Sequence, residues 1–128
     1  MANENVGVYD PGRDLTVHCQ SAVTGKRFLA IAADRITSDS SNNIVVTTAT
    51  AAGRTCGVSK YDAPAGGKCG MYRGNSRVTF VTASAALTAF QEVEVGITGQ
   101  AAPKNAGVAV GFAVTSCASG SDAEISLY

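Results

Sequence analysis

The sequence has almost none of the side chains from which catalytic sites are built. It contains one histidine, His18, and no tryptophan among its 128 residues. A serine or cysteine nucleophile needs a histidine as its base, and no GxSxG elbow accompanies His18. HExxH and EF-hand motifs are absent as well. We therefore expect no catalytic residue, no cofactor and no enzymatic activity.

Two patterns that look like chemical sites fail on spacing or on context. The Gly-Gly-Lys run at 66–68 suggests a phosphate loop, but no glycine stands five residues before its second glycine, and Cys69 replaces the magnesium-binding Ser or Thr. Glu92 and Glu94 lie two apart, like a paired carboxylate site. Carboxylates on alternate positions of a strand are more often the solvated side of a sheet. Neither pattern predicts chemistry.

Net charge and long apolar runs are missing too. The ten basic and ten acidic residues cancel and are interspersed along the chain, whereas nucleic-acid binding needs a patch of Lys and Arg. No run of about eighteen apolar residues occurs, and no charged start is followed by an apolar segment. We expect no nucleic-acid partner, no membrane association, and synthesis in the cytoplasm without a Sec-type signal.

The four cysteines form no CxxC pair, so the ligand spacing typical of structural zinc sites is missing and no metal site is predicted. Free buried thiols are the default in a reducing compartment. Cys56 and Cys69 flank a predicted turn at residues 62–67 and could face each other across a hairpin. Whether they bond depends on their Cα separation, so the sequence leaves this pairing open.

What the chain does contain is a succession of short apolar and β-branched segments separated by Gly, Pro, Asn and Asp. A short helix is the alternative at residues 26–32, and residues 82–89 are the best candidate for a helical turn. Residues 34–43 look like a polar loop and 99–105 like a turn. The pattern predicts strands at residues 15–19, 26–32, 44–50, 69–73, 77–81, 90–97, 107–115 and 124–128, with a further strand ending at Val58.

These segments are not interleaved with helical ones, so we predict an all-β fold, a small β-sandwich or barrel of about eight short strands. Residues 1–14 are polar and lack periodicity, which predicts an extended N-terminal arm ahead of a single β domain at residues 15–128. Alternation assigns the faces of the strand at 90–97: Glu92 and Glu94 point outward, and the inward set is Val93, Val95 and Ile97.

Alanine is the most frequent of the apolar residues, and its side chain buries little area. We therefore expect contacts with other subunits to add burial. In the strand at 107–115, Val108, Val110, Phe112 and Val114 share one face, and the opposite face has only small residues, which lets another backbone approach closely. The candidates for subunit contact are Ala109, Gly111, Ala113 and the terminal Tyr128.

Three runs of the chain share a characteristic order of turns and small residues: GVSKYDAPAGGKCGMYRGNSRVTF (57–80), VEVGITG (93–99) and GVAVGFAVTSCASGSDAEISLY (107–128). This order resembles the small capsid decoration, or head-stabilising, proteins of tailed bacteriophages. The resemblance covers roughly residues 44–128. Its marker positions are Gly57-Val58, Asp62-Ala63, Gly66-Gly67, Gly74 and Val110-Gly111-Phe112-Ala113.

The resemblance implies a non-enzymatic protein that binds the outer surface of a phage head, commonly as a homotrimer, and stabilises the expanded lattice of the major capsid protein. Its location is then the virion, after synthesis in the host bacterial cytoplasm. It also implies an N-terminal arm that contacts the capsid, since an extended segment can pair with an exposed sheet edge. The candidate arm residues are Val6, Val8, Tyr9, Pro11, Arg13 and Leu15.

A virion-borne or secreted β-sandwich module for glycan or cell-surface recognition is the alternative. Such a module predicts aromatic platforms on loops. The candidates are Tyr9, Tyr61, Tyr72 and Tyr128, which are scattered along the sequence. This distribution favours the decoration protein.

Overall fold

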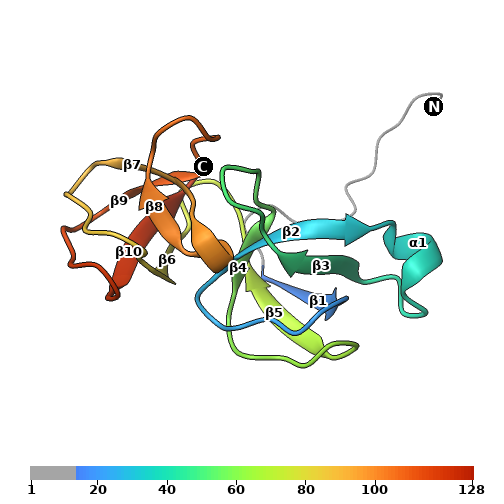
Figure 1. The fold of residues 1–128 in the computed structure, drawn as a ribbon. Coiled ribbons are helices and arrows are strands. Elements are labelled where there is room, and N and C mark those ends of the chain that lie inside the picture. Colours follow the sequence, from blue (N-terminus) through green and yellow to red (C-terminus); the bar gives the residue numbers. More distant parts are fainter. Residues whose placement is uncertain (1–13) are drawn as a thin grey trace.

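The computed structural model describes residues 14–128, which form two five-stranded β-structures lying side by side (Figure 1). The all-β prediction is confirmed, with ten strands in the described residues instead of about eight. The division into an arm and one β domain stays a prediction. The arm candidates that lie outside the described residues are Val6, Val8, Tyr9, Pro11 and Arg13.

The first β-structure is a closed barrel. Its strands are β1 Leu15–Cys19, β2 Phe28–Ala33, β3 Ile44–Thr48, β4 Gly57–Ser59 and β5 Lys68–Tyr72, in the spatial order β1-β3-β2-β4-β5. β1 runs parallel to β3 and antiparallel to β5, and the second pairing closes the ring. The alternation predicted for β1 is confirmed, because Val17 and Cys19 are fully buried while Thr16 is exposed.

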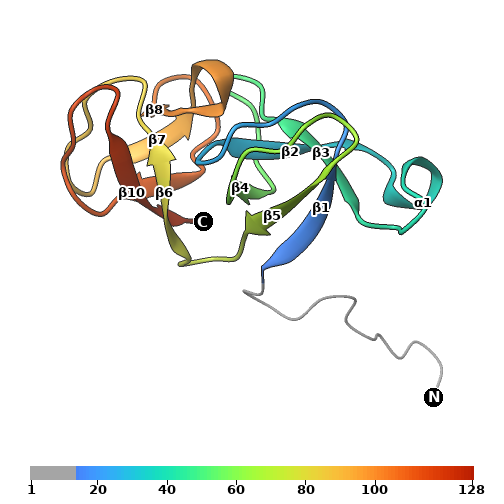
Figure 2. The ribbon, with the colours of Figure 1, turned by 90° about the horizontal axis from the view of Figure 1, so that it is seen from below.

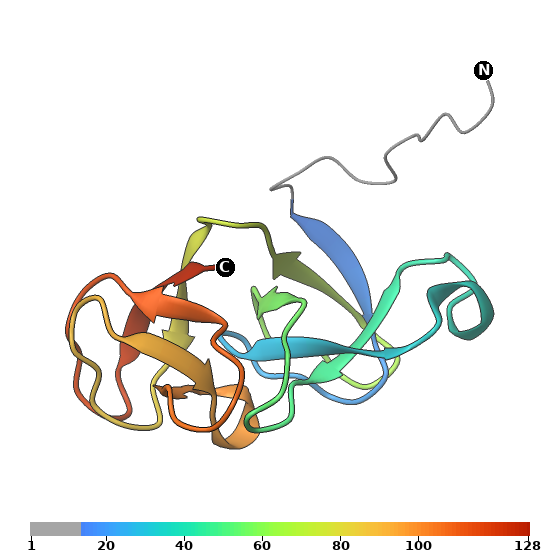
Figure 3. The same ribbon diagram turned by 90° about the horizontal axis from the view of Figure 1, so that it is seen from above.

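The second β-structure is an antiparallel sheet formed by the rest of the chain (Figures 2 and 3). Its strands are β6 Val78–Thr82, β7 Glu92–Val95, β8 Ala101–Pro103, β9 Gly111–Ala113 and β10 Asp122–Leu127, in the order β6-β10-β9-β7-β8. The C-terminal strand β10 therefore lies between β6 and β9, which explains why the predicted strand at the chain end is paired.

Two apolar clusters stabilise these structures. The smaller one, inside the barrel, includes Leu29 and Met71. The larger one includes Ile125 of the second sheet together with Phe28 and Val58 of the barrel, so it spans both β-structures. Phe28 and Leu29 are adjacent in β2 and fully buried in different clusters. β2 is thus covered on both faces at its start, which agrees with its continuous apolar sequence.

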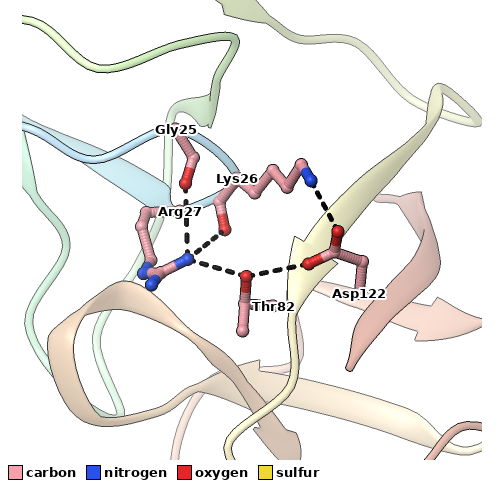
Figure 4. A network of polar contacts seen from close by, with 5 residues as sticks. All are labelled: Gly25, Lys26, Arg27, Thr82 and Asp122. Atoms are coloured by element: carbon pink, nitrogen blue, oxygen red, sulfur yellow. Dashed lines mark hydrogen bonds and ion pairs between the residues drawn. The ribbon is translucent and has the colours of Figure 1, made fainter. Parts of the chain in front are cut away.

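A polar network joins the barrel to the second sheet beside the larger cluster (Figure 4). Lys26 Nζ donates a hydrogen bond to Asp122 Oδ2 at 2.5 Å, and Arg27 Nη1 donates to Thr82 Oγ1 at 2.8 Å. Thr82 Oγ1 in turn donates to Asp122 Oδ1 at 3.1 Å. The hydrogen bond from Lys26 holds the pKa of Asp122 below its ordinary value, against the opposing effect of burial.

The predicted helical turn at residues 82–89 is wrong. This segment instead forms isolated bridges, Ala83 with Ala101 and Leu87 with Cys117, which bury both Ala83 and Leu87. Long-range pairing outweighs a weak local helix propensity here.

The helix of the described residues, α1 Arg35–Ser38, lies in the predicted polar loop, where the Asp34 side chain caps it by accepting from the Ile36 N–H at 2.9 Å.

Two further predictions at the second sheet are wrong. The predicted turn at 99–105 contains β8, whose strand conformation comes from pairing with β7. Ile97 was expected to face inward but is 68% exposed. β7 ends at Val95, and the chain enters the 3-10 turn η1 Ile97–Gly99, where Thr98 has a φ of 50°. The alternation of the strand therefore stops before Ile97.

All four cysteines are free, so Cys56 and Cys69 are not bonded to each other. The Cys56 thiol donates to Met71 Sδ at 3.7 Å, and the Cys69 thiol donates to the carbonyl oxygen of Tyr61 at 3.2 Å. Burial raises the pKa of Cys56 to about 11. Cys69 is fully buried and Cys56 half-buried, and both thiols pack as small side chains within the protein.

Candidate functional site

The outer surface of the second sheet has an unusual number of exposed large apolar side chains. Alternation in β6 places Val78 and Phe80 outward, 52% and 50% exposed, while Val81 is fully buried. The register carries this face across the sheet, since Val78 pairs with Ser126, and Ser126 pairs with Phe112 on β9. We call the side chains on this surface the aromatic face, which comprises Val78, Phe80, Phe90, Phe112 and Tyr128.

Three of these side chains form a contiguous aromatic cluster. The rings of Phe90 and Phe112 meet edge to face with centroids 5.2 Å apart, and Phe112 and Tyr128 are 6.1 Å apart. The Tyr128 hydroxyl donates a hydrogen bond to Glu92 Oε2 at 2.7 Å. That bond is the main cause of the raised pKa of Tyr128. The cluster and its carboxylate are therefore held in one arrangement.

Phe90 is the most exposed large hydrophobic side chain of the described residues, at 78%. Its backbone has a φ of 68°, a region that a bulky side chain enters only at a cost. The Phe90 N–H donates to the carbonyl oxygen of Ala113 at 2.7 Å, which fixes this conformation against β9. The fold thus keeps an aromatic ring in water, where it contributes little to the core.

The carboxylates of the aromatic face have no cationic partner within residues 14–128. Glu92, which is exposed, accepts from the Tyr128 hydroxyl, and Glu124 accepts from Thr115 Oγ1 at 3.2 Å. The ion pairs of the described residues do not involve either glutamate. The face is therefore both apolar and acidic.

A groove on the barrel has the opposite charge. It has a volume of ≈ 410 Å³ and is lined by residues that include Ala30, Ile31, Thr50, Arg54, Thr55 and Cys56. Ile31 is 62% exposed, and the exposed Arg54 has no ion-pair partner within the described part of the chain. We call it the barrel groove. It presents an apolar side chain beside a free guanidinium group.

A second cleft, of ≈ 530 Å³, lies between the barrel and the second sheet around the network of Figure 4. Its lining includes Lys26, Arg27 and Asp122. Lys26 and Asp122 form an ion pair, and Arg27 Nη1 donates to Thr82 and to the carbonyl oxygens of Gly25 and Lys26, so these groups already bond within the chain. This cleft therefore belongs to the link between the two β-structures.

The start of the described chain is anchored beside β6. Asp14 pairs with Lys60 Nζ at 2.7 Å and with Arg77 Nη2 at 2.9 Å, and Arg77 immediately precedes β6. Burial opposes ionisation of Asp14, but the hydrogen bond from Lys60 and the charge of Arg77 outweigh it, so the pKa of Asp14 is lowered. Leu15, the arm candidate that the structure describes, packs against the barrel core. The described chain thus begins beside the start of β6, an edge strand of the second sheet.

The predicted subunit-contact residues are placed very differently. Ala113 is fully buried and Gly111 is buried, whereas Ala109 is half-buried and Tyr128 is 52% exposed. The backbone that approaches the small face is β10 of the same chain, because a Cβ on Gly111 would collide with the Ser126 carbonyl oxygen. Contact of these four residues with a second copy stays a prediction.

The residues considered for chemistry are not brought together. Glu92 bonds to Tyr128, while Glu94 Oε2 accepts from the Gly107 N–H at 2.5 Å. His18 Nδ1 lies 3.6 Å from Asp39 Oδ1, to which Lys68 Nζ also donates at 2.9 Å. Within residues 14–128 no cluster of His, Cys, Asp or Glu could hold a metal ion, and no helix is long and apolar enough to cross a bilayer.

Sequence reasoning did not identify Phe80, Phe90 or Phe112 as surface residues. A signal existed in β6, where Val78 and Phe80 alternate with Thr79 and Val81, but alternation alone cannot tell which apolar set faces the core. Phe90 precedes its strand, so no periodicity applies to it. The aromatic face therefore became visible only from the register of the five strands.

With this geometry in view, the fold can be compared with known proteins. No protein family and no curated protein matches the sequence. The fold is similar to that of a bacteriophage head protein, in agreement with the resemblance found in the sequence. One matching crystal structure is the head fiber gp8.5 N base of bacteriophage phi29, with a TM-score of 0.74, 19% sequence identity, and coverage of 91% of this chain and 93% of that chain. At this identity the likeness shows a shared fold.

Proposed function

We propose that this protein is a non-enzymatic component of a bacteriophage virion, a capsid decoration protein that binds the outer surface of the head. The observation that carries the proposal is the fold, which matches a phage head fiber base over nearly the whole of both chains. The order of turns and small residues in residues 57–128 supports the same class independently of the fold comparison.

The partner is the major capsid protein, whose expanded lattice the protein stabilises. The arm residues Val6, Val8, Tyr9, Pro11, Arg13 and Leu15 contact the capsid. The position of Asp14 supports this role, because the arm starts at an anchored residue rather than at a loose one. Many copies on a lattice add weak contacts of this kind into a large total stabilisation.

The protein acts as a homotrimer, with Ala109, Gly111, Ala113 and Tyr128 as contact candidates. The exposed aromatic face supports association of copies of this chain, because a contiguous aromatic surface is typical of protein interfaces. Near-zero net charge also allows copies to pack closely. The protein is made in the host cytoplasm and then joins the outside of the head.

The experiment is co-sedimentation of purified protein with expanded and with unexpanded heads. The proposal expects saturable binding to expanded heads and weaker binding to unexpanded ones. A variant that lacks residues 2–13 but keeps Asp14 preserves the described ion pairs and isolates the arm, and it should bind less tightly. Binding to glycans but not to heads would instead support a recognition module.

A further inference from the structure

The aromatic face and the barrel groove are complementary surfaces on one chain. The face presents Phe90 and an exposed carboxylate, Glu92, two residues further along the same side of the sheet. The groove presents Ile31 and the free guanidinium group of Arg54. Each surface therefore carries an apolar group next to a charge that has no ionic partner within residues 14–128.

The two surfaces lie on different β-structures. Phe90 and Glu92 belong to the second sheet, just before and at the start of β7, whereas Ile31 lies on β2 of the barrel and Arg54 on the loop before β4. A contact between them is heterologous: one surface of a copy meets a different surface of the next. Heterologous contacts close into rings when the rotation permits, so every copy uses both surfaces once.

We propose that the aromatic face of one copy docks into the barrel groove of a second copy, with the Phe90 ring inserted beside Ile31 and Glu92 paired with Arg54. The proposal rests on the homotrimer of the proposed function; of the four contact candidates given there it uses Tyr128, which belongs to the aromatic face, and it adds the barrel groove as the opposite surface. The groove volume of ≈ 410 Å³ falls in the range of pockets that enclose small organic groups, which gives room for an aromatic ring.

Three features of Phe90 and Glu92 suit this role. The Phe90 ring is preorganised by Phe112 and by its hydrogen-bonded backbone, so little freedom is lost when it docks. The Tyr128 hydroxyl occupies Glu92 Oε2 and leaves the other oxygen available to a guanidinium group. The docked contact would also cover the most exposed apolar side chain of the described chain.

Truncation and charge-reversal variants test this proposal. The oligomeric state of each free variant is measured by analytical ultracentrifugation over a concentration series. Phe90→Ala, Glu92→Lys and Arg54→Glu are each expected to weaken association at least tenfold. The double variant Glu92→Lys with Arg54→Glu should recover much of the loss, because the reversed charges again pair across the contact. Ile36→Ala is the matched control, since Ile36 is 67% exposed, belongs to neither surface, and lies on α1 at the end of the barrel far from the second sheet (Figure 1).

Circular dichroism of each variant shows whether it is folded, and a folded variant that dissociates supports the contact. A monomeric wild-type protein, or a trimer that all three single variants leave intact, would overturn the proposal. Absence of rescue in a folded double variant would overturn the pairing of Glu92 with Arg54. Head binding separates this result from the capsid role of the proposed function: a trimer that does not bind heads refutes the capsid role alone, and a monomer that binds heads refutes the homotrimer and this interface but not the capsid role.

Discussion

Phe28 and Leu29 offer a test of whether the barrel and the second sheet unfold together. Both side chains are fully buried and adjacent in β2, but Leu29 packs inside the barrel while Phe28 packs in the cluster that spans both β-structures. Truncation to alanine removes buried apolar area and leaves a cavity. Phe28→Ala is expected to cost about 3–5 kcal/mol and Leu29→Ala about 2–5 kcal/mol.

These costs correspond to large shifts in thermal stability. For a chain of this size, a change of 1 kcal/mol lowers the melting temperature by roughly 3–5 °C. Phe28→Ala should therefore lower the melting temperature by roughly 10–25 °C. If the two β-structures form one cooperative unit, Leu29→Ala should lower the same single transition, although Leu29 makes its contacts within the barrel cluster.

The assay is native-state hydrogen exchange by mass spectrometry in increasing urea, at one fixed protein concentration because assembly adds to stability. Peptides from β1 and β5 report on the barrel, and peptides from β6 and β10 report on the second sheet. Cooperative unfolding predicts that Leu29→Ala accelerates exchange equally in both sets. Accelerated exchange of the barrel peptides alone would refute the reasoning and divide the described chain into two independent units.

Three further predictions concern single positions. Gly111→Ala should destabilise the fold by about 1–3 kcal/mol in urea unfolding, because its Cβ would collide with the Ser126 carbonyl oxygen; an unchanged midpoint would contradict that packing. The hydrogen bond from Lys68 lowers the pKa of Asp39 against the effect of burial, so its stabilisation is present above the unfolded pKa and is lost as pH falls through the folded value. Stability of Asp39→Asn should therefore fall less than that of the wild type on acidification below about pH 4, and equal losses would argue against this contact. Cys56, with its pKa raised to about 11, should alkylate slowly at pH 8 and faster as pH rises, whereas rapid reaction at pH 8 would contradict the raised pKa.

The parts of the fold that sequence predicted well are those in which local pattern and tertiary pairing agree. β1 is reproduced residue for residue, because its strict alternation matches a strand with one face in the barrel. Residues 82–89 failed for the opposite reason, since their bridges to Ala101 and Cys117 come from distant segments. β8 is a strand only because β7 lies beside it, and its Ala-Ala-Pro sequence has little intrinsic preference for one.

The candidate site was harder to predict than the fold. Tyr128 was singled out from the sequence, but Phe90 and Phe112 join it only through strand order, because residues far apart in sequence become neighbours on the sheet. Arg54 had no pattern to mark it, and its significance comes from the absence of an ion-pair partner within residues 14–128. Charge pairing is a property of the folded surface, which composition alone does not reveal.

Electron microscopy of expanded phage heads incubated with the purified protein tests the central claim most directly. The account predicts added density at regular positions on the outer surface of the head, into which the barrel and the second sheet fit. The same heads without added protein provide the reference. Heads that remain bare at saturating protein concentration, with the protein folded and in solution beside them, would contradict the account.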